Sequence, residues 1–67
     1  MNVFVENNIT IEIHYTNNLK TEMMVYLPEY EKTYFVSITN YNWQLKIMKS
    51  PYITEIEKAI GKFLKEN

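Results

Sequence analysis

The sequence contains no cysteine, no arginine and no aspartate, and it has only one glycine. Without cysteine, disulfides and most structural zinc sites are excluded. A single glycine rules out the glycine-rich loops that cradle phosphate groups. The missing arginine removes the side chain best suited to bidentate binding of phosphate. These absences weaken every interpretation of the chain as a nucleotide-binding protein.

Long apolar runs and an excess of one charge are also missing. No stretch approaches the roughly 18 apolar residues of a membrane span, and "MNVFVENNIT" lacks the pattern of a signal peptide. Seven lysines and eight glutamates give a net charge of −1, which is not typical of a nucleic-acid-binding surface. We therefore expect a cytoplasmic protein without membrane contact, and nucleic acid is a disfavoured partner.

The chain is instead rich in apolar and aromatic residues. Hydrophobic residues make up 46% and aromatic residues 15% of its 67 residues, which predicts one small folded domain over residues 1–67 rather than disorder. A chain of this length forms a marginal core, so association is expected. Asn, Lys, Ile and Tyr account for 29 of the residues, which indicates an AT-rich genome, such as that of a low-GC bacterium or its phages and plasmids.

Alternation of apolar and polar residues dominates the first two thirds of the chain, and a helical period dominates the last third. The sequence predicts an α+β fold, in which an antiparallel meander of four or five strands carries one C-terminal helix on one face (ββββα). Ser50 as N-cap and Pro51 mark the start of the helix, and a capping box of Thr54 and Glu57 offers an alternative start one turn later. Gly61 suggests close packing of the helix on the sheet. The predicted strands span about 2–6, 9–15, 19–27, 33–38 and 43–49, and the helix spans about 51–65.

Loop lengths predict the register between strands. Either a turn at Asn7-Asn8 joins the first two strands, or the first strand runs on through a bulge there. A loop at 16–18, with Asn18 in the left-handed conformation, places Glu12 opposite Glu22. Pairing of Leu27 with Tyr34 aligns the next two strands. The last hairpin pairs Ile38 with Trp43, Val36 with Leu45 and Tyr34 with Ile47, so that Tyr34 and Trp43 lie in the core.

The sheet face away from the helix carries the candidate partner-binding residues. The alternation of side chains along each strand and the predicted register place Tyr26 beside Phe35 and Met24 beside Ser37 on this outer face. Met48 lies nearby, and Tyr41 lies at a hairpin tip. Large Tyr, Phe and Met side chains rimmed by polar groups are typical of protein interfaces. The predicted partner-binding residues are Tyr26, Phe35, Met24, Met48, Tyr41 and Lys46.

Catalytic and metal motifs are weak. Ser37 or Ser50 would need His14 as a base, and no acid is recognisable as the group that orients it, so we expect no enzyme activity, no catalytic residue and no cofactor. Glu12, His14 and Glu22 share the outer face and form the one set of potential metal ligands. A solvated polar face is the favoured interpretation of these three residues, and no metal site is predicted.

Three functions are compatible with these features. The first is a small non-enzymatic protein–protein interaction module, of the type that phages and mobile elements use to block a host or defence protein (anti-CRISPR or other counter-defence inhibitors). The second is a sheet that stacks single-stranded nucleic acid on Tyr26, Phe35 and Tyr41. The third is a structural or regulatory homodimer. The expected partner is another protein, a second copy of the chain, or both.

Overall fold

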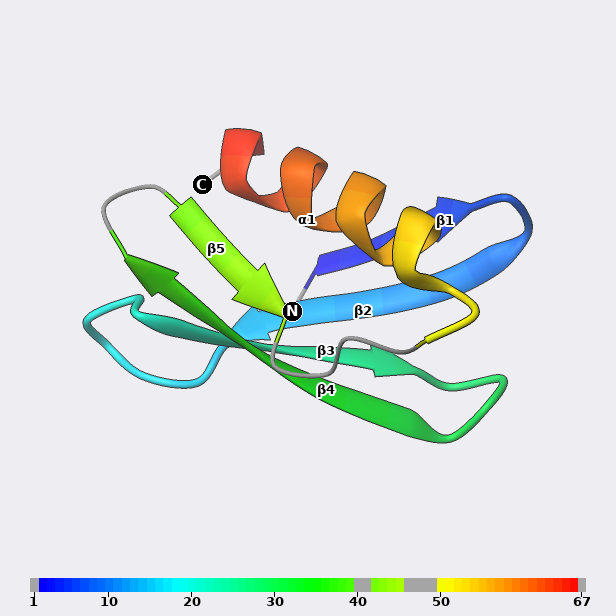
Figure 1. Ribbon diagram of the computed structural model, residues 1–67, viewed down its shortest axis with the longest axis horizontal. Helices are drawn as coiled ribbons and strands as arrows, with labels where there is room; N and C mark the ends of the chain where they lie inside the picture. Colours follow the sequence, from blue (N-terminus) through cyan, green and yellow to red (C-terminus); the bar gives the residue numbers. More distant parts are fainter. Residues whose placement is uncertain (1, 40–41, 46–49, 67) are drawn as a thin grey trace.

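A computed structural model describes residues 2–39, 42–45 and 50–66. The strands form one antiparallel sheet in the order β1-β2-β3-β4-β5, and the helix α1 follows them in the chain (Figure 1). The predicted α+β meander with a C-terminal helix is confirmed. The elements are β1 (Asn2–Glu6), β2 (Ile9–Tyr15), β3 (Glu22–Leu27), β4 (Lys32–Thr39), β5 (Asn42–Leu45) and α1 (Ile53–Glu66).

The first hairpin turns at Asn7-Asn8, as predicted. Glu6 pairs with Ile9 across the turn, and both asparagines have positive φ angles, 51° at Asn7 and 65° at Asn8. These values are typical of a type I′ turn, whose twist matches that of the flanking strands. Asparagine tolerates this left-handed conformation better than most residues, which explains why the sequence places two of them here.

The loop between β2 and β3 is longer than the sequence predicts. The Asn17 side chain accepts a hydrogen bond from the Thr21 amide at 3.1 Å and donates one to the Thr21 hydroxyl at 2.8 Å. These bonds hold residues 16–21 as a loop, in which Lys20 rather than Asn18 has the positive φ angle, 58°. The prediction that the strand begins at residue 19 is therefore wrong, and β3 begins at Glu22.

The loop between β3 and β4 also corrects the predicted register. Residues 28–31 form a turn in which the Tyr30 amide donates to the Leu27 carbonyl and Glu31 has a φ angle of 51°. Leu27 consequently pairs with Lys32 and not with Tyr34. The shift of two residues preserves strand parity, so each side chain stays on its predicted face of the sheet.

A carboxylate closes the end of the β2–β3 ladder. The register of these strands would place Pro28 opposite Thr10, but the Pro28 carbonyl already accepts the turn bond from Glu31. The Glu29 carboxylate accepts the Thr10 amide instead, at 2.8 Å. The Glu29 side chain thus replaces the Pro28 carbonyl as the acceptor for the Thr10 amide.

The hairpin between β4 and β5 has the predicted register. Val36 pairs with Leu45, and Ile38 pairs with Trp43. The predicted partner of Tyr34 in this hairpin, Ile47, lies outside the described residues, as does the rest of the predicted strand beyond Leu45.

The helix begins two positions after the predicted proline. Pro51 and Tyr52 form a turn, and α1 starts at Ile53. Ser50 still caps this start, because its hydroxyl accepts the Tyr52 amide at 3.1 Å and lies 3.0 Å from the Tyr34 hydroxyl. Gly61 is exposed, and a Cβ built on it would meet nothing within 4 Å. The expectation that Gly61 reflects close packing is therefore wrong.

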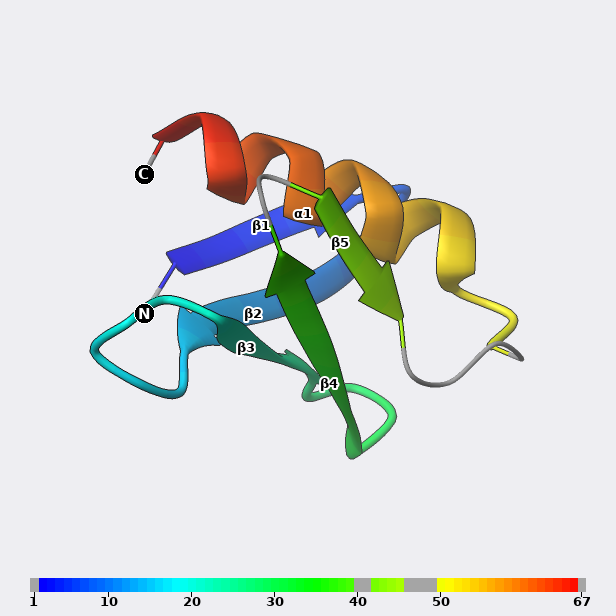
Figure 2. The ribbon, with the colours of Figure 1, turned by 60° about the vertical axis from the view of Figure 1, so that its left-hand side comes forward.

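The core lies between α1 and one face of the sheet, where α1 contacts β1 and β2 (Figure 2). Phe63 joins the helix to both strands: its ring lies 6.5 Å from that of Phe4, nearly perpendicular to it, and 4.9 Å from that of Tyr15. Tyr34 is buried as predicted. The buried hydrophobic residues are Phe4, Ile9, Ile11, Ile13, Met23, Val25, Leu27, Tyr34, Val36, Ile56, Ala59, Ile60 and Phe63.

Polar contacts also connect α1 to the first hairpin. Glu6 lies on the inner face of β1, where it is buried and forms a salt bridge with Lys62. The Asn7 side chain donates to Glu55 at 3.4 Å. A buried carboxylate is costly unless a cation compensates it, so Lys62 allows a glutamate to stand at the border of the core.

Candidate functional site

The face of the sheet that points away from α1 is the candidate site. The ribbon in Figure 1 shows α1 on one side of the sheet, and among the described residues no element lies on the other side. The burial patterns of β2 and β3 alternate, so every second side chain points to this outer face. We call Met24, Tyr26 and Phe35 the outer patch.

The outer patch is built by β3 and β4. Met24 lies directly opposite Phe35, and Tyr26 lies opposite Thr33. Phe35 is 44% exposed, while Met24 and Tyr26 are half-buried. Directly opposed residues of an antiparallel pair have Cβ atoms about 4.5–5.5 Å apart. Met24 and Phe35 therefore form one continuous apolar surface.

The neighbours within the patch differ from the predicted ones. The sequence predicts Tyr26 beside Phe35 and Met24 beside Ser37, and both pairings are wrong because β3 and β4 pair two residues away from the predicted register. Ser37 instead lies opposite Glu22, at the rim. Because parity is preserved, Met24, Tyr26 and Phe35 remain on the outer face.

The patch extends onto β2 at His14. His14 lies opposite Met24, so His14, Met24 and Phe35 form a row across three strands. The Nδ1 atom of His14 is buried and has no hydrogen-bond partner among the described residues. That atom is consequently out of reach of a ligand arriving from solution.

The candidate metal ligands do not come together. Glu12 lies opposite Tyr26, and Glu22 accepts a hydrogen bond from the Thr16 hydroxyl at 2.9 Å. The predicted opposition of Glu12 and Glu22 is therefore wrong, because the loop at 16–21 moves β3 along β2. In the part of the chain that the structure describes, no group of three or more His, Cys, Asp or Glu side chains could hold a metal ion.

The serines considered as nucleophiles are not placed beside His14. Ser37 lies on β4, and β3 separates it from His14 on β2. Ser50 caps α1 and bonds to Tyr34 at the core.

Three predicted partner-binding residues, Tyr41, Lys46 and Met48, lie outside the described residues.

Sequence reasoning missed a second exposed apolar feature of the outer face. Val3 and Val5 on β1 are 58% and 62% exposed. The signal was present in the sequence, because Val3 and Val5 alternate with Phe4, whose ring faces the core. The predicted strand at 2–6 therefore already implied that the valines face outward.

Comparisons of the chain with protein-family models, curated protein sequences and solved structures find no match. In the described part of the chain, no helix has the length and apolar character needed to cross a membrane. The function must therefore be inferred from the residues of the outer face and from their arrangement.

Proposed function

We propose that this chain is a non-enzymatic protein–protein interaction module that docks on another protein through the outer patch. The observation that carries the proposal is the direct opposition of Met24 and Phe35 on a face that no described element covers. Aromatic residues and Met are enriched at the centre of protein interfaces, and polar residues form the rim. The outer patch has this composition, with Thr33, Ser37 and Glu12 around it.

The chemistry of the patch favours an apolar protein surface as the partner. Met has a flexible side chain that adapts to different partners, and Phe and Tyr supply a large contact area at low entropic cost. The charged neighbours of the patch on the outer face include Glu12 and Glu22, both acidic. These two carboxylates disfavour nucleic acid, whose binding depends on neutralisation of phosphates by basic side chains.

The test compares Phe35→Lys with Leu19→Lys in affinity capture from a bacterial cytoplasmic extract. Both changes replace an exposed apolar residue by lysine, but Leu19 is 82% exposed in the loop at 16–21, away from the patch. We expect a partner that the wild-type chain and Leu19→Lys retain and that Phe35→Lys loses. Circular dichroism verifies that both variants are folded. Equal retention by all three proteins would exclude the outer patch as the docking site.

The more specific form of this proposal is an inhibitor, carried by a phage or mobile element, that binds and blocks a host defence protein in the cytoplasm. The small size, the near-neutral charge and the AT-rich residue usage support it. Its test is expression of the chain in a bacterium whose defence system restricts a phage. We expect plating of that phage to rise with the wild-type chain and not with Phe35→Lys. Unchanged plating across several types of defence system would argue against an inhibitor.

Fluorescence anisotropy with a labelled single-stranded oligonucleotide distinguishes the nucleic-acid alternative. Stacking on Phe35 would produce binding at low salt that weakens as salt rises and that is lost in Phe35→Lys. We expect no such binding. A salt-dependent signal that requires Phe35 would replace the protein-docking proposal with the nucleic-acid one.

A further inference from the structure

The backbone of β1 alternates between groups that bond to β2 and groups that face out of the sheet. Glu6 and Ile9 flank the Asn7-Asn8 turn, and the residues flanking a two-residue turn exchange backbone hydrogen bonds across the hairpin. Hydrogen-bonded and non-hydrogen-bonded pairs then alternate along an antiparallel ladder. The N–H and C=O groups of Val3 and Val5 therefore point away from β2, along the edge of the sheet.

An observed contact on β2 supports this assignment independently. Val5 lies opposite Thr10, and the Thr10 amide donates to the Glu29 carboxylate on the β3 side, at 2.8 Å. The Thr10 amide thus faces away from β1. Val5 and Thr10 consequently form a non-hydrogen-bonded pair, which leaves the backbone groups of Val5 facing outward.

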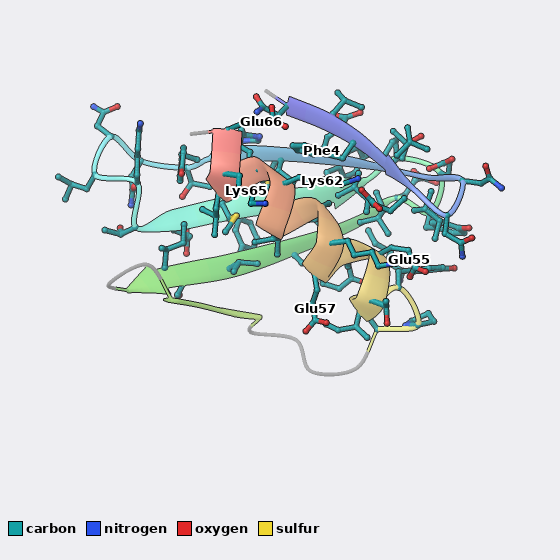
Figure 3. The ribbon with its side chains drawn as sticks, turned by 90° about the horizontal axis from the view of Figure 1, so that it is seen from above. Phe4, Glu55, Glu57, Lys62, Lys65 and Glu66 are labelled. Atoms are coloured by element: carbon teal, nitrogen blue, oxygen red, sulfur yellow. The ribbon has the colours of Figure 1, made fainter. Side chains whose placement is uncertain are left out.

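The edge formed by β1 is open along Val3 and Val5. β1 is the first strand in the sheet order, and in Figure 3 it runs along one border of the molecule while α1 lies over the face of the sheet. Proteins usually protect such edges with Pro, Lys, a bulge or an inward-pointing charge. β1 contains neither Pro nor Lys, and it pairs with β2 residue for residue. Its one inward-pointing charge, Glu6, is compensated by Lys62 of the same chain. Its side chains at the open backbone positions, Val3 and Val5, are both more than half exposed.

We propose that β1 pairs with β1 of a second copy of this chain, antiparallel, about a two-fold axis at Phe4. This register places Val3 opposite Val5 of the second copy, and each valine exchanges its open backbone hydrogen bonds with its partner. All four valine side chains then lie together on the outer face. An axis at Val3 or at Val5 would leave the other valine without a strand residue opposite it, so the strand favours the axis at Phe4.

The charges of β1 also favour a second copy of the chain as the partner that pairs with this edge. Glu6 is the one charged residue of β1, and the proposed register places it opposite Asn2 of the second copy. The two Glu6 residues are then about 14 Å apart along the strands, at about 3.4 Å per residue, which exceeds the Debye length of about 8–10 Å. Lys62 already compensates each of them. The net charge of −1 adds little repulsion between copies.

Sedimentation velocity over a concentration series tests the proposal. We expect wild type to show a monomer–dimer equilibrium. Val5→Pro removes an outward N–H that does not bond to β2, and it should weaken self-association at least about tenfold because the two-fold axis doubles the loss. Val5→Thr keeps the N–H and the β-branched shape, and it should remain within about threefold of wild type. A wild-type monomer up to about 1 mM would overturn the proposal, as would equal association of folded Val5→Pro and wild type.

Cysteine cross-linking tests the register, and it stays informative if Val5→Pro fails to fold. The chain has no cysteine of its own, so Val3→Cys and Val5→Cys chains can be mixed in equal amounts and oxidised. Directly opposed residues are within reach of a disulfide, whereas Val3 and Val3 of the second copy lie on a longer diagonal. We expect the mixed disulfide to exceed the half expected from random pairing. A random mixture, or an excess of like pairs, would overturn the proposal.

The Phe35→Lys variant distinguishes association through the β1 edge from association through the outer patch. Phe35 lies on β4, with β2 and β3 between it and β1. We expect Phe35→Lys to self-associate as wild type does even where it loses a foreign partner. If Phe35→Lys instead abolishes self-association, the copies meet through the outer patch and the β1 pairing is refuted.

Discussion

Truncation of Phe63 to alanine should remove a large part of the stability of this fold. The Phe63 ring is 2% exposed and contacts both Phe4 and Tyr15. A buried Phe→Ala change costs about 3–5 kcal/mol, and loss of two ring pairs of about 0.5–1.5 kcal/mol each favours the upper half of that range. A 67-residue chain has a total stability of about 3–10 kcal/mol, at about 0.05–0.15 kcal/mol per residue. We therefore expect Phe63→Ala to lose at least about 40% of this stability.

Urea unfolding followed by circular dichroism measures this effect. With a slope of about 1 kcal/mol per molar urea for a small domain, a loss of about 4 kcal/mol lowers the midpoint by about 4 M. Phe63→Leu keeps most of the apolar volume and should lose only about 1 kcal/mol. Lys58→Ala, at an exposed position of the same helix, should change stability by less than about 0.5 kcal/mol. A Phe63→Ala midpoint no lower than that of Lys58→Ala would refute the role of Phe63 as the link between helix and sheet.

Substitutions at three further positions have expected effects on the same urea curves. Gly61→Ala should stabilise the protein by about 0.5–1 kcal/mol, because an exposed helical glycine with open space at its Cβ gains helix propensity without a clash, and a destabilised variant would reveal packing at that site. Asn8→Gly should raise the free energy of unfolding, and Asn8→Ile should lower it by about 1–3 kcal/mol, because the residue has a φ angle of 65°. Equal urea midpoints for the two variants would contradict the turn geometry. Glu29→Ala should lower the free energy of unfolding by about 1 kcal/mol and speed hydrogen exchange at the Thr10 amide. Glu29→Gln keeps an acceptor and should lower the free energy of unfolding by less. Unchanged exchange in Glu29→Ala would show that Glu29 does not protect the Thr10 amide.

The sequence correctly predicted which face of the sheet each side chain of β2 and β3 occupies. Alternation in β2 and β3 specified which side chains face the helix, because a face buried against α1 tolerates only apolar residues. The side chains of Met23 and Val25 are therefore in the core, and those of Met24 and Tyr26 are on the outer face, as predicted.

The sequence did not correctly predict the register of β3 with β2 and β4, because the conformation of the loops determines it. Leu19 continues the alternation of β3 in sequence, but the Asn17 side chain bonds to Thr21 and draws the chain into a loop. Side-chain bonds of this kind between residues four apart are not encoded in apolar periodicity. The pair Glu12–Tyr26 could not be predicted for this reason, and the same loop separates Glu12 from Glu22. The pair Met24–Phe35 was missed because the turn at 28–31 pairs Leu27 with Lys32.

The contact of Phe63 with Phe4 has a consequence for the order of folding. Each strand pair of the meander joins neighbours in sequence, so the hairpins close short loops at low entropic cost. The α1 contacts with β1 and β2 instead join opposite ends of the chain. We therefore expect the hairpins to form early and α1 to dock late. Until the last turns of α1 arrive, the inner face of β1 and β2 remains open to water.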